Sequence, residues 1–105
     1  MVARGEIWLV RLDPTVGSEI SKTRPCVVVS PDGLNHLPVY IIVPMTTGSR
    51  PSPFRPMVEF GGRRGLLLPD QIKAVARERM LRKVGTLEPT VLSTLLDILR
   101  RVFAD

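Results

Sequence analysis

Short β-favouring segments, separated by stretches that contain proline and glycine, constrain the fold of this chain more than any other feature of its sequence. Residues 6–12 mix apolar and polar side chains in near alternation, residues 26–30 are almost all apolar, and residues 39–45 are mostly apolar. Segments of this length and composition between turn residues predict β-strands. The apolar run at 26–30 predicts a strand that is covered on both faces.

The second half of the chain continues this pattern of strands and turns. Residues 46–56 are rich in Pro, Gly and Ser, which predicts a long loop. The segment GGRRG at 61–65 predicts a turn. Three further strands are expected, at residues 57–60, at 66–75 with a break at Pro69, and at 79–87 after a short helical turn.

The last segment, 88–103, has a helical pattern. Pro89 suits the first turn of a helix, and Arg100 and Arg101 suit the last turn. Its apolar residues recur at helical spacing, at Leu92, Leu95, Leu96, Leu99, Val102 and Phe103. Many strands followed by one helix predict a mainly β fold with some α, a small curved antiparallel sheet or barrel capped by the C-terminal helix. With 105 residues and no repeats, a single domain over 1–105 is expected.

The charge balance is basic, with 15 Lys and Arg against 10 Asp and Glu and a net charge of +5. Twelve of the bases are arginine, which suits planar contact with phosphate or carboxylate. The balance points to a nucleic acid or an acidic protein as partner. The alternative is a general arginine bias of the sequence without a binding role.

Cysteine and histidine occur once each, as Cys26 and His36. A disulfide within the chain and a zinc-ligand set are therefore not expected, and Cys26, inside an apolar run, is expected to be a buried core residue. No metal and no cofactor are expected. The chain has no apolar segment long enough to span a membrane and no signal-peptide pattern, so a cytoplasmic location is expected.

Polar residues lie beside the expected strand ends, and they suggest a catalytic site. If the second and third strands pair in antiparallel fashion, Arg24 and Thr46 meet at one edge of the sheet, and the loop with Glu19 could fold over it. Arg24 can donate two N–H groups to a phosphate, Thr46 can add a hydroxyl, and Glu19 could act as general base or orient Arg24. This set suits metal-free cleavage of RNA through its 2′-OH. The alternatives are a surface ion pair between Arg24 and Glu19, and turn-forming threonines at Thr46 and Thr47.

Five segments resemble, in order and spacing, the MazF/PemK family of toxin endoribonucleases from type II toxin–antitoxin systems. They are RGEIWLVRLDPTVGSE, RPCVVVSP, VPMTT, LLLPDQIKAV and KVGTL. The resemblance covers essentially the whole chain. It implies an SH3-like barrel, a homodimer, and ribosome-independent, metal-independent cleavage of single-stranded RNA at short sequence motifs. The implied products are a 2′,3′-cyclic phosphate and a 5′-hydroxyl.

The resemblance also implies roles for individual residues. The family's catalytic arginine and threonine correspond to Arg24 and Thr46, and its acidic loop residue corresponds to Glu19. Asp70 and Gln71 match a pair that lies close to the dimer interface and the substrate groove in the family. The residues expected to bind RNA are Gly17, Ser18, Lys22, Thr47, Arg50, Phe54, Arg55 and Gln71. Phe54 could stack on a base or anchor the proline-rich loop.

The partner implied by the resemblance is an acidic, partly disordered antitoxin that covers the RNA groove, which suits the positive charge. DNA would be bound only indirectly, through the antitoxin. One alternative is a gyrase poison of the related CcdB type, but the chain ends in RRVFAD and lacks the Trp-Gly-Ile terminus of those toxins. Another is an RNA-binding barrel that does not cleave. Loss of cleavage in Arg24→Ala would favour the nuclease over both.

Overall fold

The computed structural model describes residues 2–47 and 50–105. Gly48 and Ser49, in the expected loop 46–56, lie outside the described residues. The strands within the described part are β1 (Glu6–Arg11), β2 (Thr23–Val28), β3 (Val39–Thr46), β4 (Met57–Phe60), β5 (Arg63–Leu67), β6 (Lys73–Ala76) and β7 (Met80–Thr86). One α-helix follows, α1 (Pro89–Val102), and three 3-10 turns lie at η1 (Asp32–Leu34), η2 (Pro69–Gln71) and η3 (Arg77–Arg79).

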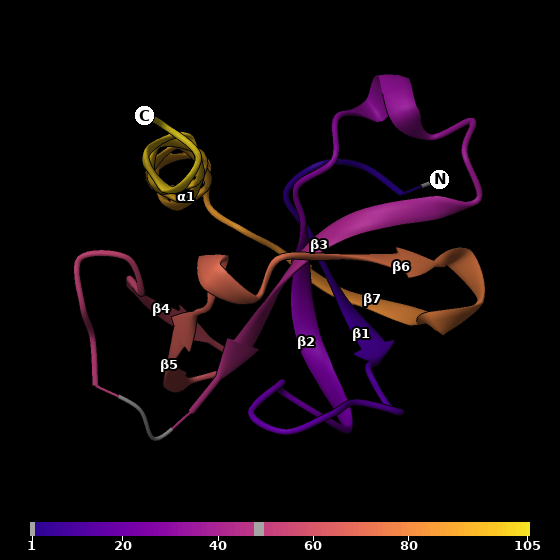
Figure 1. Cartoon of the computed structure of the whole chain (residues 1–105), viewed down its shortest axis with the longest axis horizontal. Coiled ribbons are helices and arrows are strands. Elements are labelled where there is room, and N and C mark those ends of the chain that lie inside the picture. The colour runs from indigo at the N-terminus through magenta and orange to yellow at the C-terminus, as the bar shows by residue number, and fades with distance from the viewer. Residues whose placement is uncertain (1, 48–49) are drawn as a thin grey trace.

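All strand pairs are antiparallel, in the order β4-β5-β3-β2-β1-β7, with β6 pairing with β3 beside this path. The sheet curls strongly, and α1 lies on the side of the molecule where β4 and β5 are found (Figure 1). The expected fold, a small curved antiparallel sheet with a C-terminal helix, is confirmed. No helix of the described chain is long and apolar enough to cross a membrane.

The core consists of two apolar clusters on the two sides of the sheet. One cluster contains Val27 of β2 with Leu95 and Leu99 of α1, and the other contains Cys26 and Val28 of β2. Strand side chains alternate between faces, so a strand that is buried on both sides must be apolar throughout. This explains the apolar run in β2. Burial raises the pKa of the Cys26 thiol to about 12, so this cysteine is a neutral core residue.

Strand β3 changes partners along its length, and this change positions the site. Its residues 39–42 pair with β6 and residues 42–44 pair with β2, whereas Met45 and Thr46 pair with Leu67 and Leu66 of β5. The N–H of Leu68 donates to the Pro44 carbonyl at 2.9 Å, at the point of the change. The end of β3 therefore leaves β2 and joins the hairpin formed by β4 and β5.

Several expected boundaries were wrong. The second strand begins at Thr23 and ends at Val28 instead of spanning 26–30. The expected turn 61–65 is confined to Gly61 and Gly62, whose positive φ values of 61° and 76° suit a two-residue hairpin turn, so Arg63 already belongs to β5. The break expected at Pro69 within 66–75 is confirmed, because the turn η2, which Pro69 opens, divides this segment into β5 and β6.

Candidate active site

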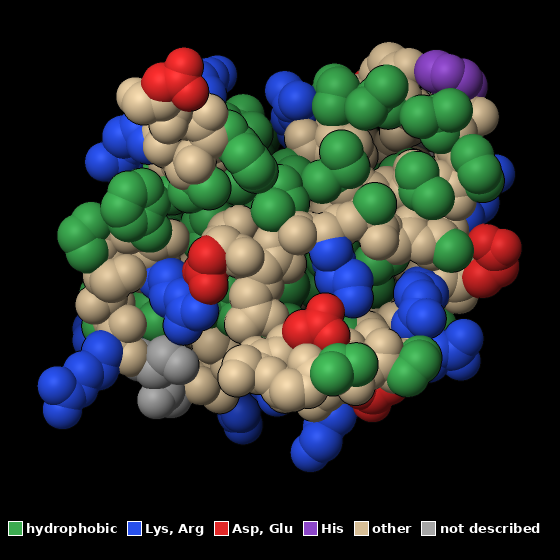
Figure 2. Space-filling model, viewed as in Figure 1, with side chains coloured by type: hydrophobic (Ala, Val, Ile, Leu, Met, Phe, Trp, Pro, Cys, Tyr) green, Lys and Arg blue, Asp and Glu red, His purple; other side chains and the backbone are tan. Residues whose placement is uncertain are grey.

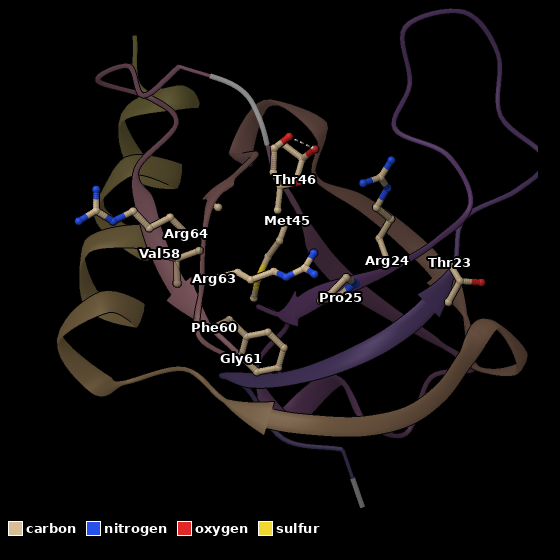
Figure 3. A pocket seen from close by; sticks show the side chains of 12 residues that line it. Thr23, Arg24, Pro25, Met45, Thr46, Val58, Phe60, Gly61, Arg63 and Arg64 are labelled. Atoms are coloured by element: carbon tan, nitrogen blue, oxygen red, sulfur yellow. Dashed lines mark hydrogen bonds between the residues drawn. The ribbon is translucent and has the colours of Figure 1, made fainter.

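A cavity of about 380 Å³ opens between the start of β2, the end of β3 and the β4–β5 hairpin. We call it the arginine cavity. Its lining consists of Thr23, Arg24, Pro25, Met45, Thr46, Thr47, Val58, Phe60, Gly61, Arg63, Arg64 and Gly65. Figure 3 shows these side chains coming from several strands to one hollow. Arg24 and Thr46, which the sequence placed beside adjoining strand ends, both line it.

A proline explains why the sheet opens at this place. The pairing of β2 with β3 ends at Cys26 opposite Pro44. The next hydrogen bond to β3 would need the backbone N–H of residue 25, and Pro25 has none. Arg24 and Thr46 lie two residues beyond this last pair, at equivalent positions on the two strands. The strands separate there, and the gap between them becomes part of the cavity.

Arg24 is half-buried and is held through one nitrogen. Its Nε donates to the Ser21 carbonyl at 3.1 Å. Its terminal nitrogens have no hydrogen-bond or ion-pair partner within residues 2–47 and 50–105. Lys22 lies in the turn before it with a φ of 69°, and its carbonyl accepts the Leu12 N–H at 2.9 Å. The guanidinium is therefore oriented by the backbone, and its outer edge is open to an anionic ligand.

Thr46 is the last residue of β3, and a glycine allows its position. Its hydroxyl donates to the Thr47 carbonyl at 3.3 Å, a long bond that a ligand could replace. A Cβ atom on Gly65 of β5 would lie 2.7 Å from the Thr46 carbonyl oxygen. Only glycine lets the two strands approach this closely, so Gly65 fixes where Thr46 lies.

The charge and polarity of the arginine cavity suit a nucleotide-like ligand. Its lining contains Arg24, Arg63 and Arg64 but no aspartate or glutamate. The side chain of Arg63 points into the hollow, whereas that of Arg64 points away from it (Figure 3). Apolar side chains such as Met45 and Phe60 form another part of the lining. Cationic groups beside an apolar surface can hold phosphate and base together.

Sequence reasoning missed Arg63 and Gly65 because the segment GGRRG was interpreted as a turn. A signal for them was present, since a Gly-Gly pair between two β-favouring segments is typical of a two-residue hairpin. In such a hairpin Arg63 is the first residue of the returning strand, directly opposite Phe60.

The structure does not bring Glu19 to this cavity. Its Oε1 accepts the Val16 N–H at 2.7 Å, within the loop that contains both residues. Glu19 instead lines a second cavity of about 350 Å³, which we call the loop cavity. The other residues of its lining are Ser18, Ile20, Asp70, Gln71, Ile72 and Lys73.

Three residues expected to bind RNA meet at or near the loop cavity. The Gln71 side chain accepts the Ile20 N–H at 2.7 Å and donates to the Ser18 carbonyl at 3.4 Å, which ties the β1–β2 loop to η2. Arg55 donates from Nε and a terminal nitrogen to both carboxylate oxygens of Asp70, at 2.9 and 2.6 Å. These bonds hold the pKa of the Asp70 carboxyl below its usual range.

The other residues that were expected to bind RNA lie at separate places on the molecule. Thr47 lines the arginine cavity, and the Phe54 ring lies 5.6 Å below the Arg101 guanidinium, a cation–π contact with α1. Phe54 is thus in contact with the helix and is also 44% exposed. Gly17, with a φ of 60°, Lys22 and Arg50 are exposed. The structure therefore divides the expected RNA-binding residues between several parts of the surface.

The curled antiparallel sheet with its C-terminal helix defines a small, mainly β protein, and the basic, partly apolar cavity is its candidate site. Residues 3–103 match the model of the family described as PemK-like, MazF-like toxins of type II toxin–antitoxin systems. The chain belongs to this family, which confirms the resemblance seen in the sequence.

Individual relatives agree with this assignment. Endoribonuclease MazF9 of Mycobacterium tuberculosis is 36% identical over 112 residues, covering 95% of this chain and 94% of the relative. Endoribonuclease toxin MazF of Escherichia coli K12 is 40% identical over 87 residues, covering 81% of this chain and 78% of the relative.

Solved structures share the fold. MazF from Deinococcus radiodurans superposes with a TM-score of 0.85 at 21% identity, over 96% of this chain and 94% of that one. A mycobacterial endoribonuclease, solved in complex with its cognate antitoxin, superposes with a TM-score of 0.80 at 18% identity, over 96% and 93% of the two chains.

Proposed function

We propose that this chain is an endoribonuclease toxin that cleaves single-stranded RNA in the arginine cavity. Two relatives that align over most of its length are named endoribonucleases. The observation that carries the proposal is the joint placement of Arg24 and Thr46 in a cavity that the Arg63 side chain also enters and that no acid of the described chain lines. RNA presents one negative charge per nucleotide, and a cavity of this charge favours it over neutral or cationic ligands.

The chemistry that suits the site is attack by the 2′-OH next to the scissile phosphate. The 2′ oxygen forms a bond to phosphorus, and the bond from phosphorus to the 5′ oxygen breaks. The 2′ proton passes to an acceptor, and the 5′ oxygen gains a proton as it leaves. The products are a 2′,3′-cyclic phosphate and a 5′-hydroxyl. Negative charge grows on the phosphoryl oxygens along this path, so fixed donors around them accelerate it.

Arg24 and Thr46 are the proposed donors to those oxygens. The terminal nitrogens of Arg24, which have no partner in the described part of the chain, can bind two phosphoryl oxygens at once. The Thr46 hydroxyl can exchange its long bond to Thr47 for one to the phosphate. The sequence predicted Glu19 as the proton acceptor, but we propose that in the described arrangement Glu19 supports the β1–β2 loop instead. Its carboxylate holds the Val16 N–H at the loop cavity, so the β1–β2 loop would have to move before Glu19 could reach the 2′-OH.

The proposed protein partner is an acidic antitoxin segment that covers the arginine cavity. Its carboxylates would occupy the places that RNA phosphates take, and the net charge of +5 favours both ligands. One structural neighbour of this chain was solved with its cognate antitoxin. Any contact with DNA would then belong to the antitoxin.

The second proposed partner is another copy of this chain. Figure 2 shows apolar side chains gathered in a band that runs from the region of α1 across one face of the molecule. The large apolar side chains that are exposed include Phe103, at 71%, and Val102, both at the end of the helical segment. An exposed apolar band of this kind favours a protein interface, and we propose that it forms a homodimer.

Incubation of the purified protein with a long RNA in the presence of EDTA tests the proposal. We expect discrete fragments, whose sequenced 5′ ends share a short motif and carry a 5′-hydroxyl. Intact RNA that is nevertheless bound would indicate an RNA-binding barrel without cleavage. Intact RNA together with trapped gyrase–DNA complexes would indicate a poison of the CcdB type. Either result would contradict the nuclease.

A further inference from the structure

We propose that Arg63 is a substrate-binding residue that holds an RNA phosphate adjoining the scissile one, from the wall of the arginine cavity opposite Arg24. The inference rests on the proposed function and extends it to a residue of the β4–β5 hairpin. It assigns Arg24 and Arg63 to two neighbouring phosphates of one strand, with the reacting phosphate at Arg24 and Thr46.

The hairpin holds Arg63 in a defined place. Gly61 and Gly62 form the turn, and Arg63 is the first residue of β5, directly paired with Phe60 of β4. Two residues further along, Gly65 lies against the Thr46 carbonyl. The strand that carries Arg63 is therefore packed directly against the proposed catalytic threonine. A side chain on such a strand is positioned more rigidly than one on a loop.

The guanidinium of Arg63 is available to a ligand. Its side chain points into the hollow that Met45 and Pro25 also line (Figure 3). Within the described residues it makes no hydrogen bond and no ion pair. Arg55, by contrast, is engaged by the Asp70 carboxylate. A cation that enters a partly apolar hollow without an anionic partner is best explained by an anionic ligand.

The shape of the cavity suits one nucleotide between the two arginines. Its volume of about 380 Å³ is within the range of small-ligand sites. Phe60 and Met45 offer an apolar surface on which a base can lie, while Arg24 and Arg63 approach from different strands. Aromatic and apolar surfaces hold bases, and guanidinium groups hold the phosphates on either side.

The adjoining Arg64 provides a matched control. It has the same charge and the same hairpin, but its side chain points away from the cavity and lies 4.0 Å from Glu59, with both side chains largely exposed. The probe is a short, labelled, single-stranded oligoribonucleotide of mixed sequence with 2′-fluoro riboses, which binds but cannot be cut. Its affinity is measured over a series of salt concentrations for wild type, Arg63→Ala, Arg63→Lys and Arg64→Ala.

We expect Arg63→Ala to weaken binding roughly tenfold, the loss of one charged contact. The slope of log K against log salt should fall by about 0.7, as for one phosphate contact to a single strand. Arg63→Lys should keep the slope and regain part of the affinity. Arg64→Ala should change binding less than about threefold, because its charge is screened by solvent. Matching thermal unfolding curves would show that all three variants are folded.

The inference and the proposed function fail in different ways. Equal affinity and equal salt slope for Arg63→Ala and Arg64→Ala would overturn the role of Arg63, while cleavage by the wild type would still support the nuclease. A wild type that neither binds nor cuts RNA would overturn both. Weaker binding and a reduced slope in Arg63→Ala alone would support the assignment.

Discussion

The arginine cavity and the loop cavity differ in how their charged groups are used. In the arginine cavity, no acid lines the wall, and the outer nitrogens of Arg24 have no partner in the described chain. At the loop cavity, Glu19 binds Val16 and Asp70 binds Arg55, so the acids there have partners already. Charged groups that form ion pairs or hydrogen bonds within the protein stabilise local structure, whereas charged groups without such a partner are available to bind a ligand. We therefore expect catalysis to take place in the arginine cavity, and we expect the loop cavity to support the β1–β2 loop.

Removal of Arg24 should have the largest effect on activity. We expect Arg24→Ala to lower the rate of RNA cleavage by about 10²–10³-fold, the usual loss when a donor to a transition-state oxyanion is removed. Asp70→Asn, in the loop cavity, should lower it by much less. Single-turnover cleavage assays on both variants give the comparison. Similar losses in the two variants would remove the distinction between the cavities.

A substitution at Gly65 that displaces Thr46 should have the next largest effect on RNA cleavage. In Gly65→Ala the new Cβ would lie 2.7 Å from the Thr46 carbonyl oxygen, so β3 and β5 must move apart. We expect a loss of about 1–3 kcal/mol in the free energy of unfolding and a loss of cleavage that exceeds what unfolding explains. Denaturant unfolding and cleavage below the unfolding transition measure the two effects.

Gly33→Ala provides the control for this variant. A Cβ at Gly33, in η1, meets nothing within 4 Å, and its backbone is not left-handed. We expect neither stability nor cleavage to change. If Gly65→Ala behaved like Gly33→Ala, the account of how Thr46 is positioned would be wrong.

Glu19 should matter less than Arg24. Glu19→Gln keeps an oxygen that can accept the Val16 N–H, so the loop should stay in place, and we expect cleavage to fall less than about tenfold. A general base is commonly worth about 10²–10⁴-fold. A loss of that size, together with loss of the acidic limb of the pH–rate profile, would instead assign the proton transfer to Glu19 and require the loop to move.

The smallest expected effect concerns stability and pH at the loop cavity. Arg55 lowers the pKa of Asp70, so the pair contributes stability above the ordinary aspartate value of 3.8 and loses it as pH falls through the lowered value. The pair is partly exposed and screened, so its contribution should be under about 1 kcal/mol. Urea unfolding of wild type and Asp70→Asn should differ near neutral pH and converge in acid. A difference that does not shrink as the pH is lowered would contradict this.

The sequence predicted most of the fold because its elements are marked locally. The helix, with its apolar spacing and Pro89, and the apolar run of β2 were recognisable from the residues themselves. The change in the strands that pair with β3 at Pro44 was not recognisable, because it depends on which strands lie beside β3 in space. The start of strand β5 was also not recognised from the sequence. Its first residues, Arg63 and Arg64, are charged, and the three glycines within 61–65 favoured the prediction of a longer turn.

The positions of side chains that depend on strand pairing could be predicted from the sequence. The positions of side chains in the β1–β2 loop could not. Arg24 and Thr46 follow from the antiparallel pairing of two adjoining strands, a rule that the sequence allows one to apply. The position of Glu19 depends on how residues between β1 and β2 fold back on themselves, and the bond to Val16 cannot be inferred from spacing. Arg63 was missed because the sequence predicted a turn over 61–65, and a sequence does not show that this side chain points into the arginine cavity.

The position of the scissile phosphate tests the central claim most directly. Once the cleavage motif is known, an RNA with that motif and a 2′-deoxy sugar at the cut site can be crystallised with the protein. The account predicts that the phosphate lies between the Arg24 guanidinium and the Thr46 hydroxyl, within hydrogen-bond distance of both. A phosphate bound instead at the loop cavity, beside Glu19 and Lys73, would contradict it.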